Sequence, residues 1–184
     1  IDNKELGGLE AVWTIDASYK CAIASAFKDA AGIVAESWLV SPIIDMTSIL
    51  STDDINLSFT QMSQKQGDAN EYMLKIKNVS DKGYWENLTF EQPEAGFKAM
   101  LVNIKLQVYA GKKIQLAFVY KNAKTDSAPK WEIQNVKIGV TPGVPGGTED
   151  DPLTCAEVIA LNNTAAGPYY VKGYIIGFAS SATS

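Results

Sequence analysis

Apolar and polar residues alternate strictly along Ile55-Asn56-Leu57-Ser58-Phe59-Thr60. Successive side chains of a β-strand point to opposite faces, so this period of two predicts a strand with one buried and one wet side. The same period recurs in 72–77, 102–108 and 114–120, and 131–138 is predicted as a last strand. Turn-favouring clusters of Gly, Asp and Pro separate these runs. Many short, half-buried strands predict antiparallel sheets packed as an all-β sandwich.

The phase of the alternation also selects the residues that face the core of this sandwich. We expect six apolar side chains to be almost fully buried between the two sheets: Leu57, Phe59, Leu74, Leu106, Leu116 and Phe118.

The chain contains no histidine among its 184 residues. Because histidine is the commonest general base near neutral pH and a frequent metal ligand, its absence argues against Ser-His-Asp or Cys-His catalysis and against His-ligated zinc. The net charge of -5, without a basic stripe, argues against nucleic acid as a partner. No apolar run approaches the roughly 20 residues needed to span a bilayer. We therefore expect a protein that is not an enzyme, with no catalytic residue, metal ligand or cofactor and no membrane span.

Proline and glycine dominate residues 141–152, which predicts a linker between a sandwich at 1–140 and a second unit at 153–184. In the second unit, Thr154 followed by Glu157 is a capping-box pattern that predicts a short helix from Cys155 to about Leu161. A strand is predicted over 169–178. One helix and one strand cannot bury a core, so we expect an incomplete module, either a remnant of high mobility or, if it is ordered, one whose strand pairs with the sandwich or with a second copy of the chain. The sequence does not decide whether Cys21 and Cys155 form a disulfide, and two free thiols are the favoured interpretation.

Three stretches of the first domain resemble the cleaved-adhesin, or choice-of-anchor J, family of Bacteroidetes surface proteins. They are Ser-Trp-Leu-Val-Ser-Pro-Ile-Ile-Asp-Met at 37–46, the segment 109–120, and the closing segment 131–138. The resemblance implies a jelly-roll β-sandwich of the kind found in adhesins, surface lipoproteins and accessory modules of secreted enzymes. Where the family's closing strand usually carries Asp, this chain has Gln134, so a structural calcium ion is not favoured. The segment 170–177 resembles the first strand of an OB-like module.

Aromatic residues beside polar groups are the candidate ligand contacts, since that combination can hold a sugar ring. Tyr84 and Trp85 follow a glycine turn, and Trp13 is followed by Thr14 and Asp16. The alternative for Trp85 is that its ring caps the edge of the sandwich, and Trp13 is equally open to a packing role. Trp38 and Trp131, which lie inside the family-like motifs, are predicted to be core residues.

These features favour a non-catalytic binding or adhesion module of a secreted or surface-displayed protein, with a glycan or a host or cell-surface glycoprotein as its partner. We expect the location to be extracellular or on the outer-membrane surface, with any export signal or anchor outside this sequence. The alternatives are a spacer domain of a multidomain surface lipoprotein and a carboxylate-only accessory domain of a glycoside hydrolase. The oligomeric state stays open.

Overall fold

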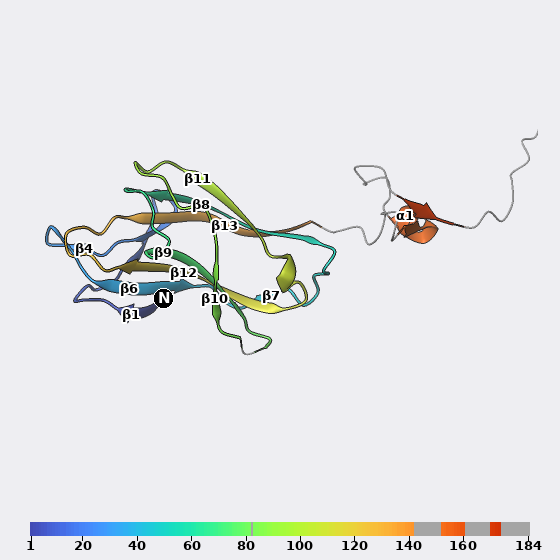
Figure 1. Cartoon of the computed structure of the whole chain (residues 1–184), viewed down its shortest axis with the longest axis horizontal. Coiled ribbons are helices and arrows are strands. Elements are labelled where there is room, and N and C mark those ends of the chain that lie inside the picture. Colours follow the sequence, from blue (N-terminus) through green and yellow to red (C-terminus); the bar gives the residue numbers. More distant parts are fainter. Residues whose placement is uncertain (82, 142–151, 161–169, 174–184) are drawn as a thin grey trace, which may run out of the picture. The chain divides into compact units, whose positions relative to one another are not determined.

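The computed structural model describes residues 1–81, 83–141, 152–160 and 170–173. Its contacts divide the chain into two units, Ile1–Thr141 and Pro142–Ser184, and each is described by itself. In Figure 1 the strands of the first unit form two layers, with β8, β11 and β13 in one layer and β6, β9 and β12 in the other.

The first sheet has the strand order β1-β6-β12-β9-β10, and β7 also pairs with β12. Every pairing in this sheet is antiparallel. The strand bounds are Asp2–Glu5 for β1, Ala35–Val40 for β6, Ile44–Asp45 for β7, Tyr72–Asn78 for β9, Trp85–Leu88 for β10 and Lys113–Asn122 for β12.

The second sheet has the strand order β11-β8-β13-β3-β2, again fully antiparallel. Its strands are β2 at Trp13–Asp16, β3 at Cys21–Ala24, β8 at Asp54–Ser63, β11 at Met100–Lys105 and β13 at Trp131–Thr141. A small hairpin of β4 (Phe27–Lys28) and β5 (Ala31–Gly32) completes the unit's strands among the described residues. The predicted all-β sandwich of two sheets is therefore confirmed.

All six predicted core residues are 5% exposed or less, so the phase of the alternation is confirmed. The centre of the core is the fully buried Trp131, whose ring stacks on Tyr72 with centroids 4.9 Å apart and planes 7° from parallel. Its indole N–H donates to Gln61 Oε1 at 3.1 Å, and the Gln61 amide in turn donates to the Glu91 carbonyl at 2.6 Å. This pairing satisfies polar groups that would be costly to bury alone.

The predicted strand at 102–108 ends earlier than its alternating pattern. β11 stops at Lys105, and Gln107–Tyr109 form the 3-10 turn η1, which leaves Val108 exposed. The Gln107 side chain explains this end, because its oxygen accepts from the Ile55 N–H at 3.3 Å and its amide donates to the Ser51 carbonyl at 2.7 Å. A side chain that satisfies backbone groups competes with continuation of the strand.

β13 contains a β-bulge between Gln134 and Lys137, where Asn135 adopts a left-handed φ of 56°. Before the bulge β13 pairs with both β8 and β3, and after it the described pairing is with β8. The extra residue changes which side chains of the strand face inward.

In the second unit the described elements are β14 (Leu153–Thr154), the helix α1 (Cys155–Ala160) and β15 (Val171–Lys172). β15 pairs in parallel with β14 of its own unit, Leu153 opposite Val171. We expected this strand to pair with the sandwich or with a second chain, so for Val171–Lys172 that expectation is wrong. Tyr170 and Gly173 of the predicted strand at 169–178 are described and do not belong to a strand, and residues 169 and 174–178 lie outside the described residues.

Candidate ligand-binding site

The three predicted ligand residues lie in different environments. Trp13 is 3% exposed, its indole N–H donates to the Ser37 carbonyl at 3.1 Å, and its ring lies 5.9 Å from that of Trp131. A ring enclosed in this way offers no face to a ligand, so the structure places Trp13 in the core and corrects its assignment as a binding residue.

Trp85 is the first residue of β10, an edge strand of the first sheet, and Tyr84 directly precedes it. Tyr84 is 90% exposed, whereas Trp85 is half-buried and meets Trp38 edge-to-face with ring centroids 5.6 Å apart. Trp38 is half-buried as well, on the side of β6 opposite the core, so its prediction as a core residue is wrong. Alternation explains the difference, because Trp38 pairs with Val119, the neighbour of the core-facing Phe118.

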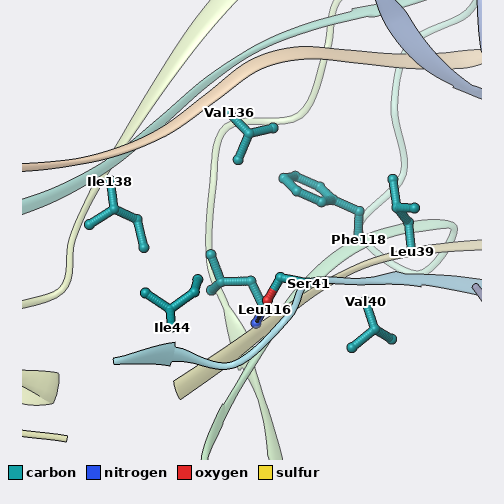
Figure 2. A pocket seen from close by; sticks show the side chains of 8 residues that line it. All are labelled: Leu39, Val40, Ser41, Ile44, Leu116, Phe118, Val136 and Ile138. Atoms are coloured by element: carbon teal, nitrogen blue, oxygen red, sulfur yellow. Dashed lines mark hydrogen bonds between the residues drawn. The ribbon is translucent and has the colours of Figure 1, made fainter. Parts of the chain in front are cut away.

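An apolar cleft of about 470 Å³ opens between the two sheets. Figure 2 shows Val136 and Ile138 of β13 facing Ile44, Leu116 and Phe118 across it. The polar lining residue is Ser41, whose hydroxyl already donates to the Pro42 carbonyl and accepts from the Leu116 N–H. The cleft therefore offers a hydroxyl-rich ligand no convergent polar groups.

A hollow of about 420 Å³ lies on the outer face of the second sheet and has a different character. We call it the aromatic hollow, and its lining residues are Tyr19, Met62, Phe97, Glu132 and Gln134.

Sheet register brings the floor of the aromatic hollow together. Glu132 of β13 lies opposite Met62 of β8, and Gln134 follows on the same face two residues later. The Glu132 carboxylate and the Gln134 amide thus point away from the core, on the side opposite Trp131 and Ile133. Two polar side chains beside a thioether make a floor that can accept and donate hydrogen bonds.

Two loops supply the aromatic walls of the hollow. Tyr19 is 74% exposed in the turn between β2 and β3, where Asp16 Oδ1 accepts from the backbone N–H groups of Ser18 at 2.8 Å and of Tyr19 at 3.0 Å. Phe97 is 42% exposed, with a left-handed φ of 55° and its N–H bonded to the Ser63 carbonyl at 2.7 Å. A bulky residue seldom adopts such a φ, so the surrounding structure holds this ring in place against a local backbone preference.

Partial burial raises the pKa of the Glu132 carboxyl above its usual value of 4.5, and the negative charge of Asp16 adds to the effect while Lys130 opposes it. A carboxylate that is incompletely solvated gains from a hydrogen-bond donor brought by a ligand. Glu132 is the one carboxylate among the residues lining the hollow, whereas glycoside hydrolysis uses a pair.

Across the described parts of the chain, no group of three or more Cys, Asp or Glu side chains is placed to hold a metal ion. Within the same residues, no helix has the length and apolarity to cross a membrane. Cys21 is buried and Cys155 is exposed, and both are free thiols.

Sequence patterns did not identify the aromatic hollow, because its walls come from turns outside the alternating runs. The available signals were an aromatic residue within each turn sequence, Tyr19 after Asp16-Ala17-Ser18 and Phe97 after Gly96. Gln134 drew attention only as a departure from a family pattern.

No family model and no curated protein sequence matches this chain. Solved structures with a similar fold include one titled "CBM4 structure and function", with a TM-score of 0.41 and 11% identity over 68% of this chain and 87% of that one. Another is the K1 cleaved adhesin domain of Lys-gingipain from Porphyromonas gingivalis W83, with a TM-score of 0.36 and 16% identity over 77% of this chain and 98% of that one. A third is the family 11 carbohydrate-binding module of a cellulosomal cellulase from Clostridium thermocellum, with a TM-score of 0.37 and 15% identity over 75% of this chain and 94% of that one. At these values the likeness assigns neither a ligand nor a site.

Proposed function

We propose that the sandwich is a non-catalytic saccharide-binding module and that the aromatic hollow holds the sugar. The observation that supports this proposal most directly is the combination of two exposed aromatic rings, Tyr19 and Phe97, with a carboxylate and an amide in one hollow. Sugar rings present apolar C–H faces that pack against aromatic rings, and hydroxyl groups that bond to carboxylates and amides. The volume of about 420 Å³ lies within the usual range for small-ligand sites, roughly 300–1,000 Å³.

The proposal includes a secreted or surface-displayed parent protein and a glycan or glycoprotein partner. It also retains the jelly-roll relationship to the cleaved-adhesin family and the incomplete OB-like character of residues 153–184. Trp13 is no longer among its ligand residues.

The test is calorimetric titration of the full chain with neutral oligosaccharides selected from a glycan array, with Tyr19→Ala and Phe97→Ala as variants. Each variant removes one wall of the hollow, and we expect a loss of at least about tenfold in affinity, or 1.4 kcal/mol. Phe27→Ala is the matched control, because it removes an exposed aromatic ring of β4 that does not line the hollow. If both wall variants bind as the parent chain does, the hollow is not the site. A folded protein that binds no glycan at all overturns the proposal and favours the spacer role.

A further inference from the structure

Two tryptophans meet over the outer face of the first sheet. Trp38 stands on β6 and Trp85 on β10, with β12 and β9 between them. Strands lie about 4.8 Å apart, so the backbones of β6 and β10 are separated by roughly 14 Å. The ring centroids are nevertheless 5.6 Å apart, so the two side chains reach toward each other across the intervening strands. Ala117 and Val119 of β12 are 0% exposed beneath them, although alternation directs both away from the core.

Lysines surround this tryptophan pair on the same face. Lys75 Nζ lies 5.5 Å and Lys4 Nζ 5.6 Å from the centroid of the Trp38 ring, which is within cation–π range. Three lysines of the face are ion-paired: Lys4 with Asp2 at 2.7 Å, Lys113 with Asp45 at 3.0 Å and Lys121 with Glu36 at 3.2 Å.

Lys75 and Lys77 differ from these three, because neither forms an ion pair within the described part of the chain. Lys75 instead donates to Asn87 Oδ1 at 2.6 Å. In the register of β9 with β10, Lys77 lies opposite Trp85 and Lys75 opposite Asn87. The two lysines share one face two residues apart, so their Cα atoms are about 7 Å from each other. Two lysines without a direct ion pair thus adjoin an aromatic surface on a chain whose net charge is -5, although the Glu36 carboxylate, bonded to Lys121 and to the Trp38 indole, lies close enough to Lys75 to attract it.

We propose that this face, made of Trp38, Trp85, Lys75 and Lys77, binds an acidic saccharide through a uronic acid residue. The aromatic rings would pack against the sugar ring, and its carboxylate, which has two acceptor oxygens, would accept hydrogen bonds from the two ammonium groups. Asn87 adds an amide beside Lys75, and the exposed Tyr84 extends the aromatic surface past the edge of β10. This site lies on the sheet opposite to the aromatic hollow, differs from it in charge, and does not depend on it.

Charge complementarity favours a uronate over a nucleic acid. A duplex carries one negative charge per roughly 1.7 Å and rewards many cationic contacts. This face offers two lysines outside the ion pairs of the described residues, and the remainder of an acidic chain would repel a polyanion of that density. A carboxylate on every sugar unit of a polyuronate presents a lower and more localised charge.

The experiment compares two polymers that share a backbone, polygalacturonate and its fully methyl-esterified form, in affinity electrophoresis and calorimetry with the full chain. Esterification removes the charge and leaves the sugar rings. We expect the acidic polymer to bind at least about tenfold more tightly and to lose that advantage in 0.5 M salt, because exposed ion pairs are screened.

Lys75→Gln with Lys77→Gln should weaken binding to polygalacturonate at least about tenfold and leave any binding to the esterified polymer unchanged. The matched control, Lys65→Gln with Lys137→Gln, removes the same charge at exposed lysines elsewhere and should bind as the parent chain does. Tyr84→Ala should weaken binding without altering its salt dependence. Tyr19→Ala with Phe97→Ala should have no effect, which separates this site from the aromatic hollow.

Three results would overturn the inference. Equal binding of the two polymers would mean that charge is not recognised. An equal loss in the control variant would mean that attraction is general rather than local. Tighter binding of single-stranded nucleic acid than of polygalacturonate would assign the face to a different polyanion.

Discussion

Because the backbone at Phe97 is left-handed, replacing this residue by glycine or by alanine should affect the stability of the protein differently and its saccharide binding equally. Alanine at a φ of 55° bears a cost of about 1–2 kcal/mol that glycine does not. Glycine in turn loses about 0.5–1 kcal/mol more than alanine through its greater freedom in the unfolded chain. Both replacements remove the same ring. Phe97→Gly should therefore be more stable than Phe97→Ala by roughly 0.5–1 kcal/mol, whereas both should lose saccharide binding equally.

Urea unfolding followed by tryptophan fluorescence measures this difference, and calorimetry measures the binding. Phe27 supplies the control, since it is also exposed but lies in β4 with an ordinary negative φ. There the order should reverse, with alanine at least as stable as glycine. If Phe97→Ala equals or exceeds Phe97→Gly in stability, the backbone at this position is not strained. The surrounding structure then does not hold the Phe97 ring against a backbone preference.

Three further outcomes can be measured on the same chain. Gln61→Leu should cost about 1–3 kcal/mol of unfolding free energy, because it leaves the buried Trp131 N–H without its acceptor; urea unfolding that shifts by less than about 1 kcal/mol would contradict this. The raised pKa of Glu132 means that the folded state binds its proton more readily than the unfolded state, so ionisation costs stability as pH rises through the folded pKa. Glu132→Gln should accordingly gain stability over the parent chain at pH 7 and lose that gain below about pH 4.5, the usual value, in melts across pH. With a thiol reagent, the exposed Cys155 should react at once and the buried Cys21 only after denaturant is added, whereas two fast thiols would place Cys21 at the surface.

Alternation along the chain was enough to predict the sandwich and the burial of residues such as Phe118, because a buried face imposes its period on a long strand. It was not enough for the tryptophans. β2 has four residues, too few to establish a period, and its two apolar residues on one face differ in burial, since Trp13 is buried while Ile15 is exposed. Trp38 lies in a run of mostly apolar residues, Trp38-Leu39-Val40, where period two is absent.

The candidate sites were harder to predict for a different reason. The aromatic hollow is lined by residues of two turns and of two strands. The face of Trp38, Trp85, Lys75 and Lys77 brings together side chains of β6 and β10, which are separated by two other strands. Such groupings depend on which strands become neighbours, and local sequence carries no information about that. The part that could be anticipated was Tyr84 and Trp85 as aromatic residues next to a glycine turn.

The strand order has a consequence for how the sandwich is made. β12 and β13 come last among the strands of the first unit, yet each lies inside its sheet, β12 between β6 and β9 and β13 between β8 and β3. The first sheet lacks a central strand until β12 has been synthesised, and the second lacks one until β13 has, so β6 and β3 wait for these partners while the strands between them in sequence are made. Contacts this distant in sequence slow folding, typically to milliseconds or seconds. Until Thr141 has emerged, the nascent chain exposes unpaired strand edges, and it is then that a chaperone would have most to protect.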